Sequence, residues 1–413
     1  WEQALDAAGF RKLLSGSVDL SKSTIYMSQG KYVMSEESGL GVIVRKNIKA
    51  IKGGYSQFSE GTDVSARDID AYVTVISGDV NGNKQADAGD CGLLLVKKGH
   101  IAIEGVTFQY GYVSEADASA TECGSGIYVS GSASDTSIEL TDCVIRDCKS
   151  GVTTSAKQGG PAVFVLSGQV RLNKVSLLDN TAAGRGGAVR CSSKTAVVFM
   201  NGCLLKGNSH NGSWGNGIQM SEGHICINNT TLIENMGTGA ALNGGGSILL
   251  TNNTIIGNAN DSHGAVRCET GVGGDTKFIN NLLISENPSA PSFNLNGSNF
   301  EAFSKGYNVY QRVTGITMSA SDTAYPNQVN GALNEEGVYV WDLNQIGSVK
   351  GYATRQAVIE VAKSFNPVAS PITNLGEVFV EWIGEDAFGI DQRGVTRNAN
   401  KMQAGAYDAV LAN

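Results

Sequence analysis

The chain has 413 residues, of which 41% are hydrophobic and 17% are charged, and its formal net charge at pH 7 is −8. Because this composition offers no basic surface, we expect no nucleic-acid partner. No apolar run approaches the roughly 20 residues of a membrane-spanning helix, so we expect no transmembrane segment in this chain.

Residues 1–14 predict a short amphipathic helix, since Trp1, Leu5, Ala8 and Leu13 recur at helical spacing. Short strand-like runs bounded by glycine or polar turns follow up to residue 55, and they predict less regular first coils of a stack. An open stack of strands exposes unpaired backbone groups at its end. We therefore expect the helix to cap the stack.

A polar loop at residues 79–90 interrupts these runs. Oxygen-bearing side chains occupy loop positions 1, 3, 5, 9 and 12: Asp79, Asn81, Asn83, Asp87 and Asp90. This is the ligand spacing of a calcium loop, but position 6, where that loop has glycine, is Lys84. Two interpretations remain open: a solvated turn rich in Asn and Asp, or a Ca²⁺ site. Beyond this loop the sequence indicates no cofactor.

Six copies of one unit fill the stretch from Gly124 to Asn287. The last residues of the copies are Cys148, Asn180, Asn208, Asn235, Asn258 and Asn287. Apolar residues lie three positions before each end, at Ile145, Leu177, Leu205, Leu232, Ile255 and Ile284. Apolar residues also lie eight positions before it, at Leu140, Leu172, Met200, Ile227, Leu250 and Ile279. A fixed internal pattern with variable joins predicts stacked coils, with the Asn residues forming a ladder in the turns.

A short alternating run after the glycines of each copy predicts one sheet of the stack, the glycine-side sheet. Alternation turns one set of residues inward: Ile127, Val163, Val189, Ile218, Ala241 and Val266. The outward set is Tyr128, Phe164, Arg190, Gln219, Leu242 and Arg267. Coils that repeat in one direction stack parallel strands. We therefore predict an all-β fold, a right-handed parallel β-helix over residues 1–310.

The eight cysteines do not follow a disulfide pattern. Cys191 and Cys268 share a column three coils apart, which at the spacing of neighbouring strands is ~14 Å, well beyond the reach of a disulfide. Cys143 and Cys203 likewise share a column two coils apart. The spacing predicts buried thiols that act as small apolar side chains.

Residues 311–413 lack the repeat, and we expect an irregular C-terminal cap or appended subdomain that closes the solenoid. A helix is predicted at 355–365. Near the end of the chain, two carboxylates and two guanidiniums come close together in sequence: Asp391, Arg393, Arg397 and Asp408. Such a group is typical of a structural ion-pair cluster, so we expect it to close the last coil.

Candidate ligand-binding residues lie where the repeat fails. They are Tyr128, Arg190, Trp214, Arg267 and Glu269. Spaced aromatic rings and arginines suit a linear, acidic glycan, because rings stack on sugars and guanidiniums bind carboxylates bidentately. Alternatives remain: a solvated surface, an adhesin that contacts protein, or an enzyme. A glycoside hydrolase needs two carboxyls roughly 5 to 9.5 Å apart, and Glu222 or Asp261 would have to swing in from turns to partner Glu269.

Several motifs resemble those of known families. GGAV at 186–189, with LLDN at 177–180, LKGN at 205–208 and LIEN at 232–235, resembles the GGAI and FxxN repeats of polymorphic-outer-membrane-type β-helix proteins, with Leu or Ile in place of Phe. DQRGVTR at 391–397 and GAYD at 405–408 resemble a C-terminal signature of exported bacterial β-helix proteins of the pectate-lyase-like superfamily.

The resemblance implies a right-handed β-helix that is exported to the cell surface. In lyases of this superfamily the corresponding sheet carries the substrate and an arginine acts as base beside a bound cation, a role for which Arg190 and Arg267 would be the candidates. Because the chain begins at Trp1, we expect any export signal to lie outside it. Taken together, these features predict a monomeric, extracellular or surface protein that binds a polysaccharide or host glycan, with catalysis as the alternative.

Overall fold

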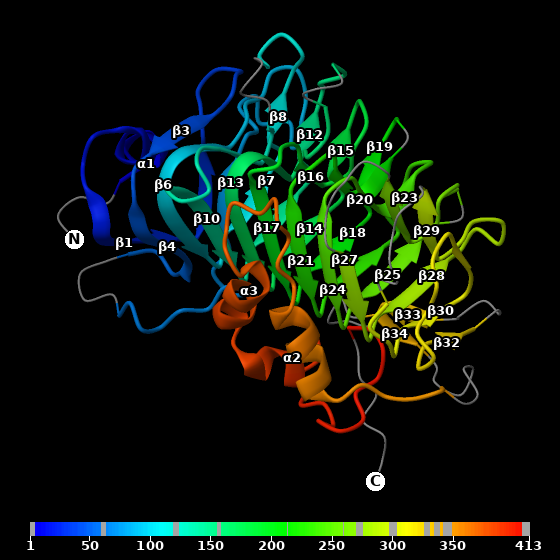
Figure 1. Ribbon diagram of the computed structural model, residues 1–413. Helices are drawn as coiled ribbons and strands as arrows, with labels where there is room; N and C mark the ends of the chain where they lie inside the picture. Colours follow the sequence, from blue (N-terminus) through cyan, green and yellow to red (C-terminus); the bar gives the residue numbers. More distant parts are fainter. Residues whose placement is uncertain are drawn as a thin grey trace.

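The computed structural model describes residues 5–58, 63–118, 124–154, 158–212, 214–258, 260–269, 276–296, 304–325, 331–333, 339–341 and 349–406. Most of the described strands run parallel and stack in chain order from the N-terminal to the C-terminal coils (Figure 1). The predicted all-β parallel β-helix is therefore confirmed.

Each regular coil contributes a strand to each of three faces. The glycine-side sheet contains β3 (Val42–Arg45), β6 (Leu94–Glu104), β9 (Ile127–Ser130), β13 (Val163–Asn173), β16 (Val189–Cys191), β20 (Gly215–Met220), β23 (Ala240–Gly244), β26 (Val266–Glu269), β29 (Phe293–Asn296) and β31 (Val313–Thr314). The helix-side sheet contains β1 (Leu20–Ser28), β4 (Ile48–Tyr55), β10 (Thr136–Thr141), β17 (Ala196–Asn201), β21 (His224–Asn228), β24 (Ser247–Thr251) and β27 (Thr276–Ile279). The long strands β6 and β13 take part in both sheets.

The third sheet contains β2 (Gly30–Val33), β5 (Thr74–Ser77), β7 (Thr107–Gln109), β11 (Val144–Arg146), β14 (Ser176–Leu178), β18 (Leu204–Lys206), β22 (Thr231–Ile233), β25 (Thr254–Gly257), β28 (Leu282–Ser285), β30 (Val309–Tyr310) and β32 (Thr323–Ala324). A narrow fourth sheet joins β8 (Tyr112–Val113), β12 (Lys149–Ser150), β15 (Thr181–Ala182) and β19 (Ser209–His210). β33 (Gly331–Leu333) pairs antiparallel with β34 (Tyr339–Trp341). Because β32 still pairs in parallel with β30, the coils continue beyond residue 310, where the sequence suggested that they end.

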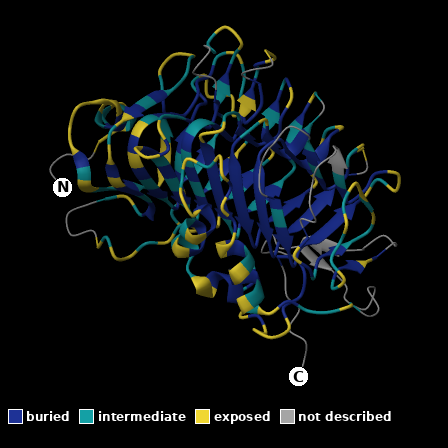
Figure 2. Cartoon of the chain, viewed as in Figure 1, coloured by how far each residue is buried: buried dark blue, intermediate teal, exposed yellow. Residues whose placement is uncertain are grey.

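The inward side chains of these sheets, together with Phe10 and Leu14 of the N-terminal helix, form one apolar core that runs along the solenoid to Phe293. Figure 2 shows the strands as predominantly buried in the central and C-terminal coils. Both predicted apolar columns pair in register through the first five copies. In the sixth copy the prediction is wrong by one residue. Phe278 and Leu283 occupy the columns instead of Ile279 and Ile284, because that copy has one extra residue before its end.

A second register error affects the glycine-side sheet. Leu242, and not Ala241, pairs with Ile218, so Asn243 takes the outward position between Gln219 and Arg267. The cause is a register shift in β20, where one more residue lies between two paired positions than in β23. An extra residue of this kind bends a strand and reverses the alternation that follows it.

The N-terminal helix α1 (Ala7–Ser15) packs against β2 and β3. Asp6 caps it by accepting a hydrogen bond from Gly9 N at 2.8 Å. Phe10 and Leu14 form its buried face, whereas Leu5 is 43% exposed and Ala8 is also exposed, so the predicted apolar face is wrong at these two residues. Trp1 lies outside the described residues.

The asparagine ladder is confirmed for three copies. Asn180 N donates to Asn208 Oδ1 at 3.1 Å, and Asn208 N donates to Asn235 Oδ1 at 3.2 Å. A second ladder, which the repeat pattern does not predict, runs through Thr230, Asn253, Asn281 and Asn308. In both ladders a side-chain oxygen satisfies a buried backbone N–H of the neighbouring coil.

The seven cysteines in the described part of the chain are free and buried, as predicted; Cys123 falls outside it. Burial raises the pKa of the Cys191 and Cys268 thiols to about 12. They are therefore neutral apolar side chains of the core and not nucleophiles.

The C-terminal part lies along the side of the coils (Figure 1). Helices α2 (Arg355–Lys363) and α3 (Leu375–Ile383) and the 3₁₀ helix η2 (Glu385–Gly389) pack against the helix-side sheet. Phe379 contacts Phe199 of β17, with ring centroids 5.4 Å apart. The helix predicted at 355–365 is thus confirmed as α2, but its place is beside the solenoid and not across its last coil.

The Asp391–Arg397 signature also attaches to the middle of the solenoid. Arg397 is buried and donates hydrogen bonds to Asn229 Oδ1 at 2.9 Å and to Gly405 O at 3.0 Å. Asn229, in the turn after β21, donates in return to Ile390 O at 2.9 Å. Asp391 accepts from Arg393 Nε at 2.9 Å, and Asp408 lies outside the described residues. The expectation that this group closes the last coil is therefore wrong: it clamps the C-terminal segment to a central turn.

Candidate functional site

A polar cluster on the outer face of the glycine-side sheet surrounds Trp214, in the turn before β20. The guanidinium carbons of Arg185 and Arg267 lie over its indole ring, 5.5 and 5.8 Å from the ring centroid. These are cation–π distances. Trp214 has a φ of 128°, a strained value for a residue with a side chain. The Trp214 turn packs closely against Gly239 in the next coil. Only glycine fits at position 239, because a Cβ there would lie 1.3 Å from Trp214 O.

Glu269 and Asn243 complete the cluster. Arg267 Nη1 forms an ion pair with Glu269 Oε1 at 3.5 Å. Asn243 Nδ2 donates to the same Glu269 oxygen at 3.3 Å and to Gln219 Oε1 at 3.2 Å. The described part of the cluster thus holds the two guanidiniums of Arg185 and Arg267 against one carboxylate, and its net charge is positive.

Three buried polar atoms of this cluster have no hydrogen-bond partner within the described structure. They are Trp214 Nε1, Arg267 Nε and Asn243 Oδ1. Buried polar atoms are nearly always paired, with protein or with ordered water, because leaving one unpaired costs free energy. Two donors and one acceptor on neighbouring coils therefore indicate a place where a polar ligand or water binds.

Two predicted binding residues do not belong to this site. Tyr128 is on the outer face but is only 1% exposed. It packs with Phe164 and Leu95 in a satellite apolar cluster that Leu40 and Ala118 border. The prediction that Tyr128 binds a ligand is wrong. Alternation shows which face of the sheet a residue is on, but it does not show whether another segment, such as the one that contains Ala118, covers that face.

Arg190 is also a structural residue. It is 6% exposed, and its guanidinium donates to Gln158 O at 2.6 Å and to Ser221 Oγ at 3.3 Å while it lies over the Phe164 ring.

Trp214, Arg267 and Glu269 are brought together as the sequence suggested. Arg185 and Asn243 were missed. Arg185 could have been found from the sequence, because it occupies the same turn position as Trp214 in the preceding coil. Asn243 could not, because the register error assigned it to the inward face.

A buried network supports the turns around Trp214. Asp261 Oδ2 accepts from Asn258 N at 2.7 Å, and its Oδ1 accepts from the side-chain amides of Asn258 and Asn216. Asn216 Oδ1 lies 2.8 Å from His210 Nε2. Burial, more than the nearby Glu286, raises the pKa of Asp261 to about 8. Asp261 is fully buried and held by these bonds, so it cannot swing out to partner Glu269 as a second catalytic carboxyl.

The histidine beside the cluster is kept neutral. His263 Nδ1 lies 2.7 Å from Ser262 Oγ. Burial lowers the pKa of His263, and the positive charge of Arg267 lowers it further. At neutral pH this imidazole therefore adds hydrogen-bonding capacity to the turn and no positive charge.

Comparison with known proteins places the fold. The family model described as "Right handed beta helix region" matches residues 71–283, just over half of the chain. The chain belongs to this right-handed β-helix family. No curated protein and no solved structure matches it. Within the described ranges, no helix of this β-helix protein is long and apolar enough to cross a membrane.

The 79–90 loop of the β-helix directs its oxygen atoms toward internal partners. Asp90 accepts from Val80 N at 2.9 Å and from Asp87 N at 3.0 Å, and burial raises its pKa despite these bonds. Asp79 pairs with Lys31 Nζ at 3.1 Å. Asp87 accepts from the side-chain amides of Asn81 and Asn83. No group of three or more His, Cys, Asp or Glu suited to a metal ion occurs in the described part of the chain, and the solvated turn and the Ca²⁺ site both stay open as interpretations.

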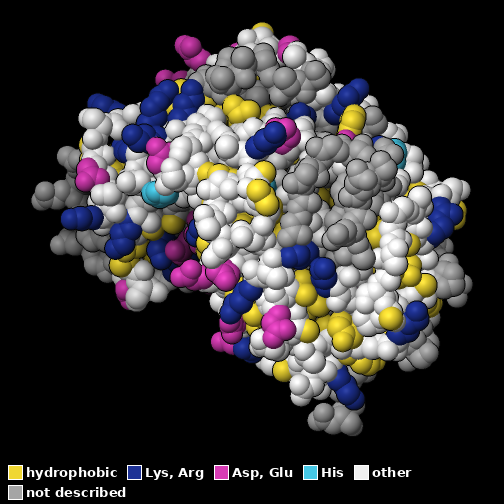
Figure 3. Space-filling view, viewed as in Figure 1, with side chains coloured by type: hydrophobic (Ala, Val, Ile, Leu, Met, Phe, Trp, Pro, Cys, Tyr) yellow, Lys and Arg dark blue, Asp and Glu magenta, His cyan; other side chains and the backbone are white. Residues whose placement is uncertain are grey.

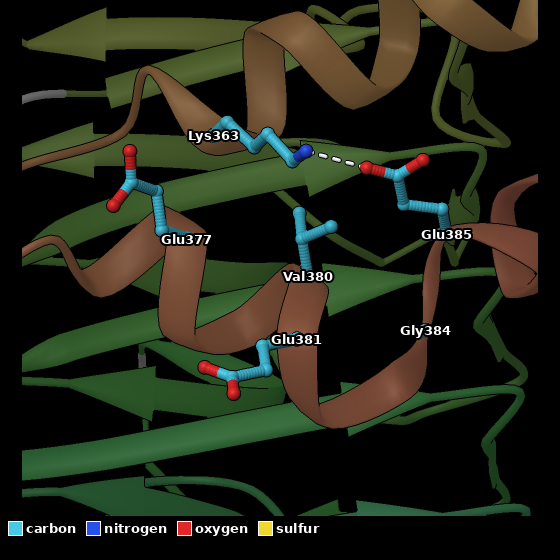
Figure 4. A pocket seen from close by; sticks show the side chains of 6 residues that line it. All are labelled: Lys363, Glu377, Val380, Glu381, Gly384 and Glu385. Atoms are coloured by element: carbon cyan, nitrogen blue, oxygen red, sulfur yellow. Dashed lines mark hydrogen bonds and ion pairs between the residues drawn. The ribbon is translucent and has the colours of Figure 1, made fainter.

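Clefts lined by described residues also lie outside the Trp214 cluster. One, of about 350 Å³, lies beside α2 and α3 and is lined by Lys363, Glu377, Val380, Glu381, Gly384 and Glu385 (Figure 4). Lys363 Nζ bonds to Glu385 Oε1 at 2.5 Å across it. Acidic and basic side chains lie side by side over these helices in the space-filling view (Figure 3). Another cleft, of about 390 Å³, is lined by Ser285, Glu286, Asn287, Pro288, Ala290, Gln311 and Arg312.

Proposed function

We propose that this β-helix is an exported cell-surface protein that binds a polysaccharide or host glycan through Trp214, Arg267 and Glu269. The observation that carries the proposal is the indole of Trp214 with its unpartnered Nε1, beside the unpartnered Nε of Arg267. Sugar rings present a C–H face that packs on an indole and hydroxyls that both donate and accept hydrogen bonds. The two free donors and the Asn243 acceptor match such hydroxyls.

The net positive charge of the cluster favours a glycan that carries carboxylates. Arg185 and Arg267 outnumber Glu269 in the cluster, and guanidiniums bind carboxylates bidentately. In the described structure no hydrogen bond or ion pair holds the guanidinium of Arg185. Its side chain is therefore able to leave the indole face when a sugar ring arrives. Export to the cell surface is supported by the resemblance of the 391–397 and 405–408 motifs to those of exported β-helix proteins.

The test is a binding panel of uronate-containing and neutral polysaccharides, with and without Ca²⁺, measured by affinity electrophoresis and calorimetry. We expect Trp214→Ala and Arg267→Ala each to weaken binding about tenfold or more, as expected when a charge-assisted or stacking contact is lost. Lys305→Ala removes an exposed positive charge on another face and is the matched control. Undiminished binding in the Trp214→Ala/Arg267→Ala double variant would show that this cluster does not bind the glycan.

The same incubations report on catalysis. New unsaturated sugar ends would identify a lyase, and new reducing ends without them would identify a hydrolase. Binding without either product is the result that we expect, because the described part of the cluster offers the single carboxylate of Glu269 rather than the pair that hydrolysis needs.

A further inference from the structure

A continuous row of turns leads from Trp214 toward the cleft at residues 285–312. Thr238 Oγ1 donates to Gly212 O at 3.3 Å, and Ser262 Oγ donates to Thr238 O at 2.6 Å. Asn287 Nδ2 then donates to Asp261 O at 3.0 Å. Each bond joins a turn to its neighbour in the next coil. Three such steps at the spacing of parallel strands cover ~14 Å along the solenoid axis.

The side chains along this row are open to solvent. Thr238 and Ser262 are exposed, and His263 is partly exposed. The row therefore presents hydroxyl and imidazole groups between the Trp214 cluster at one end and the cleft at the other. A ligand that lies along the row meets polar groups in every coil.

The cleft at the far end has the size and chemistry of a sugar subsite. Its volume of about 390 Å³ falls within the range of small-ligand pockets, roughly 300–1,000 Å³. Pro288 and Ala290 provide apolar wall, while Glu286 and Arg312 provide charged groups at the rim. Gln311 Oε1 accepts from Ser285 N at 2.7 Å, which holds the two sides of the cleft together. The guanidinium of Arg312 donates to Ser289 O, which anchors it over this wall.

We propose that the cleft is a second subsite for the same glycan, so that the ligand is an oligosaccharide chain lying parallel to the solenoid axis from Trp214 to Arg312. This inference rests on the proposed glycan binding at Trp214. It predicts that affinity depends on ligand length: a short oligosaccharide fills only the Trp214 cluster, and one long enough to cross three coils also fills the cleft.

The test compares a size series of one oligosaccharide, from the disaccharide upward, taken from the polymer that the wild-type chain binds best. Calorimetry is done on the full chain and on the Arg312→Ala, Trp214→Ala and Lys305→Ala variants. We expect Arg312→Ala to weaken binding of the long oligosaccharides about tenfold and to leave the shortest ones unaffected. Trp214→Ala should weaken both, and Lys305→Ala should weaken neither.

The outcomes separate this inference from the proposed function. If Trp214→Ala weakens binding while Arg312→Ala leaves the long oligosaccharides unaffected, glycan binding stands and the second subsite is wrong. Equal losses for short and long ligands in Arg312→Ala also overturn the second subsite, because the cleft then does not add to the Trp214 cluster. If the wild-type chain binds no glycan of any length, both proposals fail.

Discussion

Asp261 should make the stability of this β-helix fall as pH rises. Its pKa is raised from 3.8 to about 8 by burial, so the folded chain holds the proton that the unfolded chain releases near its ordinary pKa. A neutral Asp261 therefore stabilises the fold fully below about pH 4, and this contribution declines as pH rises and is gone above about pH 8. Between about pH 5 and about pH 8 the loss is on the order of 4 kcal/mol.

Replacing Asp261 by Asn removes this titration and keeps the size and most of the polarity of the side chain. The amide nitrogen of Asn cannot accept the hydrogen bond from Asn258 N, so we expect a constant cost of about 1–2 kcal/mol at every pH. The free-energy difference between variant and wild type should then shift in favour of the variant by on the order of 4 kcal/mol between about pH 5 and about pH 9.

Urea unfolding of both proteins at the two pH values measures this shift, and other titrating groups cancel in the difference. Asp386→Asn is the control, because its side chain is 95% exposed and the same charge is removed without burial. A difference that stays constant, or that moves toward the wild type as pH rises, would show that Asp261 is ionised in the folded chain. The hydrogen-bond donors around it, and not burial, would then set its charge.

Three further outcomes follow from the geometry. Asn208→Ala should destabilise the chain by about 2–4 kcal/mol in urea unfolding, because it removes the buried hydrogen bonds from Asn180 N to Asn208 Oδ1 and from Asn208 Nδ2 to Leu177 O. A cost below about 1 kcal/mol would contradict a stabilising role for the ladder. Arg397→Lys should speed proteolytic release of the C-terminal segment, because an ammonium group cannot reproduce the two guanidinium bonds to Asn229 Oδ1 and Gly405 O. An unchanged rate of cleavage would argue that Arg397 does not clamp this segment. A calorimetric titration with excess Ca²⁺ should give no heat, because Lys31 and backbone N–H groups already occupy Asp79 and Asp90; heat that disappears in Asp90→Asn would instead establish the calcium loop.

The sequence predicts the inward-facing half of this structure well. The inward position that Leu205 or Met200 occupies must hold an apolar residue in every coil, because it faces the core. Aligned copies of the repeat therefore show an apolar residue at that position each time. The two register errors occur where one copy has an extra residue, in β20 and after β28. An extra residue changes which side chain faces inward but barely alters local composition, so it is hidden from a pattern based on spacing alone.

The outward-facing half depends on what covers it, and that information lies far away in the chain. Tyr128 and Phe164 are buried under Leu40 and Ala118, and Phe199 is buried under Phe379, which follows it by 180 residues. The same long range explains the C-terminal signature. Nothing near Arg397 in sequence indicates that its partner is Asn229, so a cluster that looks self-contained in sequence is a clamp in the structure.

The candidate site lies in positions that stacking does not constrain. The outward column Phe164, Arg190, Gln219, Asn243 and Arg267 has one backbone environment and four different kinds of side chain, so stacking alone cannot explain its composition. The Asn ladder shows the opposite case, in which one residue type recurs because each copy solves the same hydrogen-bonding problem. In the described structure, buried polar atoms without partners include those of Trp214, Asn243 and Arg267, where the copies differ, and also Asn280 Oδ1 in a repeated turn, whereas the Asn180–Asn208–Asn235 ladder has none. Around Trp214, three such atoms lie together on neighbouring coils, so this cluster is the place where we expect an external ligand to supply hydrogen bonds that the described chain does not.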